Sequence, residues 1–212
     1  MRRGAVRAGH ATLRRHRHVT VCGFVIVLTL AWVGLFTLVA AAESQIQTRY
    51  DGQRLDFHLD VLLSAPEAHV VAVIHDYDRL VLVFPLVVDS GLLEDFGNGV
   101  QRVRAHMKGC VLVFCRQLKH VLDVHPSPGA GAWGSARSVP GQSDVRAGHL
   151  SWRTEAPSPE QTRLTLSGWL EPDVWVPPLL GPPVVRRAVE RHFREAMPRL
   201  EEAARNWLPP EP

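Results

Sequence analysis

The sequence predicts one α+β domain, in which a curved antiparallel sheet surrounds a long C-terminal helix, preceded by an apolar N-terminal segment outside that domain. Two patterns indicate this class: strand-like stretches with short turns follow a pair of short helices, and a long amphipathic helix ends the chain. The composition agrees, since 46% of the 212 residues are hydrophobic and 21% are charged. We expect the domain to span residues 53–208, with 209–212 as a tail.

The N-terminal segment combines a basic start with a long apolar run. Residues 1–18 carry six arginines and no acidic residue, and residues 19–42 contain no charge over 24 positions. At ~1.5 Å per residue, such a run can cross a hydrocarbon layer ~30 Å thick. The arginines would stay on the cytoplasmic side. We therefore expect a bacterial inner-membrane segment, followed by a linker over 43–52 and a domain that faces the periplasm or the outside.

The apolar run has more than one interpretation. Three alanines at positions 40–42 supply the small residues of a signal-peptidase site, which would release a periplasmic or secreted protein. The run is longer than the usual signal core of about 7–15 residues, which favours a retained membrane anchor. A buried structural helix is the third interpretation.

The basic charge belongs to the N-terminal segment. From Glu43 onward the chain has 18 Lys plus Arg against 21 Asp plus Glu, a net charge of −3. Phosphate backbones are bound by a surplus of basic residues. This balance, together with export, argues against a nucleic-acid partner.

The cysteines of an exported domain can form disulfides. Cys110 and Cys115 stand five positions apart in a stretch that has the pattern of a single strand. An odd offset directs two side chains to opposite faces of a strand, about 16 Å apart along the chain. We therefore expect two small buried residues with no bond between them, an intermolecular bond being the alternative.

The first elements of the domain are a strand and two short helices. Residues 54–61 alternate strictly between polar and apolar, which predicts a half-buried strand. The Ser-Ala-Pro-Glu sequence at 64–67 has the form of a capping box, and helical spacing follows it. A second short helix over 76–84 would end at Pro85.

Five further strands are predicted, at 86–94, 100–108, 111–124, 144–153 and 161–171. Short turns join the first three, which makes them an antiparallel meander. Residues 125–142 are rich in Pro, Gly and Ser and are expected to form a surface loop. Their Gly-x-Gly-x-x-Gly match lacks the strand before it and the helix after it that a dinucleotide site requires, so we predict no cofactor.

The last element is an amphipathic helix over residues 182–207. Apolar residues repeat along one face, and charged residues with Glu/Arg pairs at i, i+4 occupy the other. A sheet that curls around this helix would bury the apolar stripe.

The element order and five short stretches carry a resemblance to a known family: 55–61, 64–67, 76–78, 109–116 and 170–178. Together they resemble the START-like (Bet v 1-like, SRPBCC) helix-grip superfamily, and more narrowly its bacterial polyketide cyclase and coenzyme Q-binding group. The resemblance covers most of the chain after the apolar run. It implies a deep apolar cavity between sheet and C-terminal helix, which in relatives holds lipids, quinones, sterols or aromatic polyketides. Because these families share no universal catalytic set, no catalytic residue is carried over.

Short catalytic and metal-binding motifs are missing from the sequence. It contains no G-x-S-x-G, HExxH, Walker A or CxxC pattern, and none of the eight histidines after the apolar run forms a close pair at metal-ligand spacing with a nearby Cys or carboxylate cluster. We therefore predict no metal site. Two polar residues of strand 111–124, Arg116 and His120, share a phase with its leucines. If that phase faces the cavity, both groups project into apolar space; if the alternate phase does, both lie in solvent.

The leading hypothesis is a non-enzymatic, exported and membrane-tethered binder of a lipid-like or quinone-like molecule. The predicted wall consists of residues on strand 111–124 and on the long helix: Leu112, Phe114, Leu118, Val185, Val189, Phe193 and Met197. One alternative is a cyclase- or dehydratase-type enzyme in which Arg116 and His120 act on a hydrophobic carbonyl compound. The other is an interaction module of the cell envelope, whose outer sheet face docks a partner protein.

Overall fold

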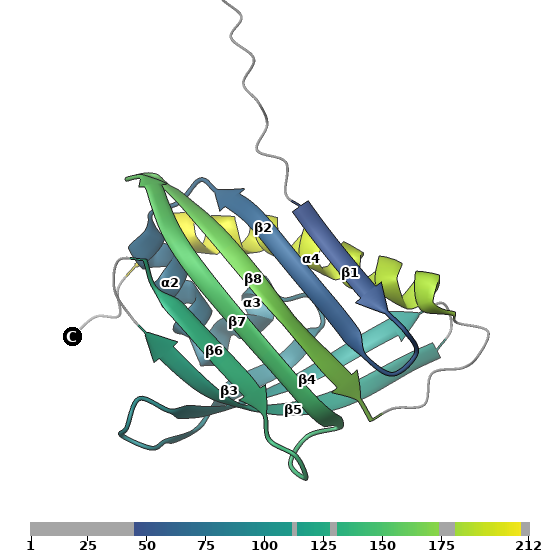
Figure 1. Cartoon of the computed structure of the whole chain (residues 1–212). Coiled ribbons are helices and arrows are strands. Elements are labelled where there is room, and N and C mark those ends of the chain that lie inside the picture. The colour runs from purple at the N-terminus through teal and green to yellow at the C-terminus, as the bar shows by residue number, and fades with distance from the viewer. Residues whose placement is uncertain (1–44, 112–113, 128–130, 174–180, 209–212) are drawn as a thin grey trace, which may run out of the picture. The chain divides into compact units, whose positions relative to one another are not determined.

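The computed structural model describes residues 45–111, 114–127, 131–173 and 181–208 (Figure 1). These residues belong to one compact unit, Ala42–Pro212. None of the helices in these ranges is both long enough and apolar enough to cross a membrane. The predicted membrane segment at 19–42 lies outside the described residues.

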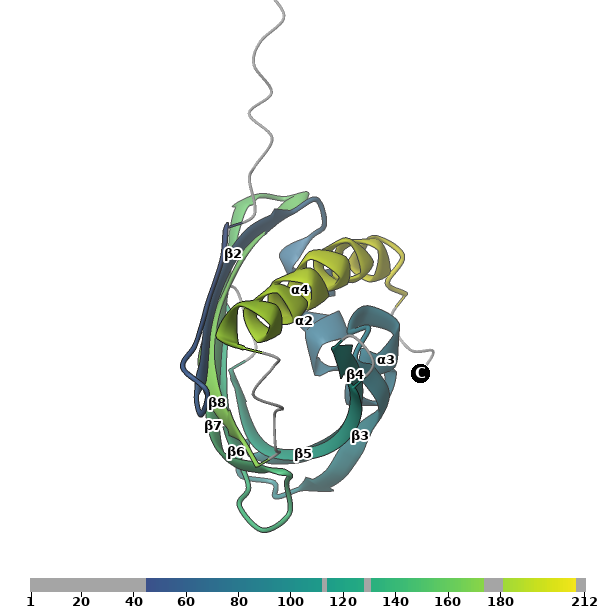
Figure 2. The same cartoon turned by 90° about the vertical axis from the view of Figure 1, so that its right-hand side faces the viewer.

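Within these ranges, eight strands form one antiparallel sheet in the order β1-β2-β8-β7-β6-β5-β4-β3. The strands are β1 (Gln45–Tyr50), β2 (Leu55–Leu63), β3 (Val87–Asp95), β4 (Gln101–Val111), β5 (Phe114–Ser127), β6 (Trp133–Ser138), β7 (Val145–Ser158) and β8 (Gln161–Pro172). The helices are α2 (Glu67–His75), η1 (Tyr77–Arg79), α3 (Leu80–Val83) and α4 (Pro182–Arg205). Figure 2 shows the sheet bending into a U whose open side is spanned by α4. The predicted α+β class is confirmed.

The short helices carry the chain across the open side of the sheet. After β2 the chain re-enters the sheet at β3, which lies at the opposite end of the strand order. The intervening residues therefore have to cross between the two arms of the U, and α2, η1 and α3 form this crossing (Figures 1 and 2). A sheet and these helices on its concave side bury a shared core.

The apolar stripe of α4 faces that core. Its buried residues recur at helical spacing: Phe193, Ala196, Met197, Leu200 and Ala204. The Phe193 ring packs on that of Phe57 from β2, with centroids 5.5 Å apart. Two hydrogen bonds also connect the helix to other elements: Thr48 Oγ1 donates to Glu190 Oε1 at 2.8 Å, and the Ser64 amide donates to Glu201 Oε2 at 2.9 Å.

The structure corrects the prediction about the two cysteines. β4 continues to Val111 and β5 begins at Phe114, so Cys110 and Cys115 are register partners on neighbouring strands. Their Cα atoms lie 4.0 Å apart and a disulfide joins them. Both residues are exposed. The prediction of two buried, unbonded cysteines is wrong because it placed both on one strand, where the side chains would have diverged.

Two strands occupy segments that were predicted to be irregular. β1 lies in the predicted linker, where every second residue is partly buried. β6 lies inside the predicted surface loop, where Gly134 and Ala136 are buried. A Cβ atom on Gly134 would lie only 2.1 Å from Trp152 Cζ2. The glycine therefore makes room for an indole ring from the neighbouring strand, a role that glycine often has inside strands.

The capping-box prediction is also wrong, although the helix that was predicted to follow the capping box is present. The N-cap residue of α2 is Pro66, and no side chain caps the helix. Glu67 Oε1 instead accepts hydrogen bonds from Thr154 Oγ1 at 2.7 Å and from the Gly131 amide at 3.0 Å. The glutamate thus connects the helix to the sheet.

Candidate functional site

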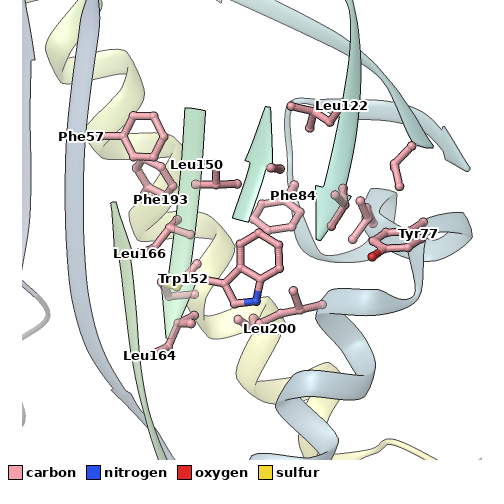
Figure 3. Close-up of a pocket in the computed structure, with 16 residues that line it drawn as sticks. Phe57, Tyr77, Phe84, Leu122, Leu150, Trp152, Leu164, Leu166, Phe193 and Leu200 are labelled. Atoms are coloured by element: carbon pink, nitrogen blue, oxygen red, sulfur yellow. The ribbon is translucent and has the colours of Figure 1, made fainter. Parts of the chain in front are cut away.

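An apolar cavity of about 210 Å³ lies between the concave face of the sheet and the helices (Figure 3). Sixteen side chains line it: Phe57, Ile74, Tyr77, Leu80, Phe84, Val103, Leu122, Val124, Ala136, Leu150, Trp152, Leu164, Leu166, Phe193, Met197 and Leu200. None of these side chains is charged. A charged group held in the cavity would lose its hydration without gaining a counter-charge from this wall.

The sheet side of the wall follows the two-residue period of strands. Alternate residues of one strand point to the same face, and the wall contains the i, i+2 pairs Leu122 with Val124, Leu150 with Trp152, and Leu164 with Leu166. The phase of β5 that faces the cavity at these positions is therefore the one that contains Leu122 and Val124.

The helix side of the wall comes from α4 and from the crossing. Phe193, Met197 and Leu200 follow one another at i, i+4 and i+7 on α4, so they project from one face of the helix. Tyr77 of η1 and Phe84, just after α3, close the opposite side (Figure 3). A cavity between the sheet and the C-terminal helix was implied by the family resemblance, and it is present.

Two titratable groups lie at the α2–η1 end of the cavity. Burial raises the pKa of Tyr77 to about 12, with a smaller contribution from the charge of Asp95. Burial lowers the pKa of His75 below its ordinary value. Both side chains are therefore uncharged at neutral pH.

A second imidazole, that of the partly buried His192, packs between aromatic rings. Its centroid lies 6.1 Å from the Phe84 ring and 5.7 Å from the Phe193 ring. Burial lowers its pKa to about 4, against an opposing effect of the Glu195 charge. His192 is thus a neutral ring that supports two wall residues from behind.

The predicted wall residues have different locations. Phe193 and Met197 line the cavity. Val189 packs against the adjoining core, and Val185 is only partly buried. Leu118 borders a separate pocket with Val88 and Met107. The side chains of Leu112 and Phe114 lie outside the described part of the structure.

The two predicted polar candidates do not meet at the cavity. Arg116 is exposed near the disulfide end of β5. His120 is partly buried on the same strand, where its Nε2 is hydrogen-bonded to Ser138 Oγ at 2.8 Å. Burial lowers the pKa of His120 to about 4. Neither residue is part of the wall described above.

Most of the wall was not identified from the sequence. Trp152 and Tyr77 contribute large aromatic surfaces, and both lie in elements whose positions were predicted. Trp152 could have been predicted as a wall residue, because it lies on the same face of a predicted strand as Leu150. Within the ranges that the structure covers, no three His, Cys, Asp or Glu side chains gather as a metal site would require.

The curved sheet, the crossing helices and the C-terminal helix over an apolar cavity define the helix-grip fold of START/Bet v 1-like proteins, as the resemblance implied. No family model and no curated protein matches the sequence.

Solved structures share the fold at low sequence identity. The Zhui aromatase/cyclase from Streptomyces sp. R1128 is 20% identical, with a TM-score of 0.55 over 71% of this chain and 93% of that chain. A STAR-related lipid transfer protein from Xanthomonas axonopodis is 17% identical, with a TM-score of 0.53 over 74% and 98%. A START superfamily protein from Mycobacterium smegmatis is 15% identical, with a TM-score of 0.53 over 72% and 97%. These identities establish the fold alone.

Proposed function

We propose that the domain binds a small hydrophobic molecule in the cavity beneath α4. The observation that carries this proposal is an apolar cavity of about 210 Å³ whose sixteen lining side chains include no charge. An apolar cavity of about 150 Å³ can already hold benzene. Transfer of the ligand from water would be driven by apolar burial, at ~25 cal/mol per Å².

The volume narrows the class of ligand. Typical sites for drug-sized molecules measure about 300–1,000 Å³, which exceeds the about 210 Å³ found here. This size favours a molecule of one or two rings, such as a quinone head, or a single short acyl chain. A lipid with two full acyl chains would need the cavity to enlarge.

We further propose that the domain is exported, either tethered by residues 19–42 or released after cleavage. Two independent features support export: the uncharged run of 24 residues and the exposed Cys110–Cys115 disulfide. Disulfides persist in oxidising compartments and are rare in the cytosol. Fractionation of a bacterial host, with mass spectrometry of the N-terminus and of thiol alkylation, tests both. An intact N-terminus in the cytosolic fraction with free thiols would contradict the proposal.

Ligand retention is tested by native mass spectrometry of the full chain isolated gently from its host, combined with organic extraction. Wild type should carry a stoichiometric hydrophobic molecule. The variant Ala136→Phe fills the cavity from β6 and should lose it. Ala156→Phe makes the same change at an exposed position of β7 and should retain the molecule. An empty wild-type domain, or equal retention by Ala136→Phe, would overturn the proposal.

The cyclase- or dehydratase-type alternative receives less support from the geometry. It needs Arg116 and His120 within direct or one-water reach of a substrate. Arg116 is exposed, and His120 is hydrogen-bonded to Ser138 away from the lining side chains.

An envelope interaction module is the second candidate, because large apolar side chains are exposed on α3, β3 and the following turn: Val81, Leu82, Val88, Leu92, Leu93 and Phe96. Exposed apolar surface of this kind is typical of protein-contact sites. A photo-crosslinker at Leu82, which is 63% exposed, would trap one partner protein if this candidate is correct. Crosslinks spread over many proteins would speak against it.

A further inference from the structure

A row of arginines runs along the solvent side of α4. Arg187, Arg191 and Arg194 follow one another at i, i+4 and i+7, so they project from one face of the helix, and all three are exposed. Within the described part of the chain, the ion pairs of α4 involve two other arginines. The row therefore presents three guanidinium groups to the surroundings without an ion-pair partner among these residues.

The charge of this helix differs in sign from that of the rest of the domain. α4 carries six arginines and four glutamates, a net charge of +2, whereas the chain from Glu43 onward has a net charge of −3. The exposed glutamates of the helix, Glu195 and Glu202, lie to one side of the arginine row, because each residue turns the helix by about 100°. The row extends over about 10 Å, and arginine is well suited to binding phosphate groups. A partner that presents several phosphates side by side would match it.

The arginine row lies beside the start of β1. α4 packs against β1, which is the first strand in the sheet order (Figure 1). Two hydrogen bonds set the direction of the helix along the sheet, one between Thr48 and Glu190 and the other between Ser64 and Glu201. Gln45 begins β1, and its pairing with β2 puts it between the levels of Thr48 and Ser64. The last two arginines of the row lie between positions 190 and 201 of the helix, so they are at the level of Gln45.

The apolar run at 19–42 ends close to this point in the chain. Only Glu43 and Ser44 separate it from β1. With the run as a membrane anchor, three steps of at most ~3.6 Å hold Gln45 within about 11 Å of the end of the run. A bilayer surface then lies next to the start of β1 and to the arginine row beside it. Anionic headgroups attract basic side chains that come within a Debye length of about 8–10 Å.

We propose that Arg187, Arg191 and Arg194 contact the phosphate groups of anionic phospholipids in the membrane that holds the chain. The proposal rests on the tethered form of the proposed function. Two points, the anchor and the arginine row, then fix the orientation of the domain on the bilayer. This contact is separate from the cavity, because the lining residues Phe193 and Met197 project from another face of the same helix.

The full chain in lipid nanodiscs tests the proposal, with phenylglyoxal modification and mass spectrometry as the measure of which guanidinium groups are accessible. In nanodiscs that contain phosphatidylglycerol, the three arginines should react at least about fivefold more slowly than in neutral phosphatidylcholine nanodiscs. High salt should abolish this difference. Arg137 is exposed on the outer side of the sheet, next to the cavity-lining Ala136, and should react equally fast in both lipids. Equal rates for the arginine row in both lipids would overturn the proposal.

Two double variants separate the row from a general effect of charge. Arg191→Gln with Arg194→Gln should weaken docking about 25-fold, at about fivefold per arginine, so Arg187 should lose most of its protection. Arg137→Gln with Arg153→Gln removes the same charge from exposed positions of β6 and β7 and should leave that protection unchanged. Equal losses in both variants would overturn the proposal. A full chain that separates from phosphatidylcholine nanodiscs on gel filtration would contradict the tether and the proposal with it, whereas ligand retention in the cavity is measured independently by native mass spectrometry.

Discussion

Substitution of Gly134 by alanine should destabilise the domain by forcing Trp152 out of its position. The added Cβ would lie 2.1 Å from Trp152 Cζ2 and 2.4 Å from Cε2, whereas ordinary contacts begin at 3.4 Å. The indole ring, or the backbone of β6, must therefore move by about 1.3 Å at that contact. Trp152 is 8% exposed and lines the cavity, so the ring can move only by displacing core neighbours or by entering the cavity. Overpacking of this kind costs about 1–3 kcal/mol.

Urea unfolding followed by circular dichroism measures this loss in the free energy of unfolding. Gly109→Ala is the matched control in another strand, because its Cβ would meet only Leu86 Cδ2 at 3.8 Å, and it should change stability by less than about 0.5 kcal/mol. Combining Gly134→Ala with Trp152→Leu should recover most of the loss caused by the glycine substitution, which shows as a coupling energy in a double-mutant cycle. Wild-type stability of Gly134→Ala, or purely additive effects in the cycle, would refute the steric argument.

Three other substitutions or conditions have definite expected outcomes. Leu200→Ala, at a site that is 1% exposed, should lower the free energy of unfolding by about 2–5 kcal/mol in urea titrations; a loss under 1 kcal/mol would contradict its place in the core. Reduction of the Cys110–Cys115 bond should lower the free energy of unfolding by up to about 2 kcal/mol, a small loss because the loop that the bond closes is short. Cys110→Ser in oxidising buffer should show the same loss, and equal stability with and without reductant would contradict this prediction. The pKa values of His120 and His192 are lowered to about 4, so between pH 6.5 and pH 4 the unfolded chain binds protons at these histidines that the folded chain does not. The free energy of unfolding should therefore fall as the pH drops from 6.5 toward 4, by at most roughly 3 kcal/mol per histidine. His192→Phe should remove part of that slope in pH-dependent unfolding, and an unchanged slope would argue against the buried neutral ring.

Periodicity in the sequence was sufficient to predict the type and the buried face of the helices and strands that carry a repeating apolar pattern. The α4 stripe through Phe193, Met197 and Leu200 was visible at helical spacing, and it is buried as expected. The alternation in β2 likewise agrees with its buried Leu55, Leu59 and Val61. These patterns report burial directly, because one face of each element packs on the core.

Contacts between residues on different strands could not be predicted from periodicity. A shift in where β4 ends and β5 begins converts Cys110 and Cys115 from two faces of one strand into register partners. Local periodicity does not specify which residues face each other across a hairpin. Similarly, the sequence around Gly134 predicts a loop, because the sequence does not show that Trp152, eighteen positions later, packs against this glycine. Predicting which alternate residues of β5 face the cavity requires the same long-range information. The wall residues Leu122 and Val124 were therefore not predicted.

The cavity itself should lower the stability of the ligand-free domain. Empty core volume costs about 24 cal/mol per Å³, so a cavity of about 210 Å³ that is partly open to solvent corresponds to at most roughly 5 kcal/mol at that rate. This is comparable to the whole free energy of unfolding of many domains, about 5–15 kcal/mol. A ligand that binds only the folded state would offset this cost.

The same reasoning separates a functional cavity from a packing defect. Ala136→Phe places a large apolar side chain in the space, where its burial contributes about 1.5–3 kcal/mol. The ligand-free variant should therefore be more stable than ligand-free wild type by roughly 1–3 kcal/mol in urea unfolding, while losing ligand retention. A variant that gains stability and loses the ligand would show that the open volume serves binding at the expense of stability. A destabilised Ala136→Phe would instead mean that the space is already filled by the motion of its neighbours, such as Trp152, and that the void is smaller in solution than its walls suggest.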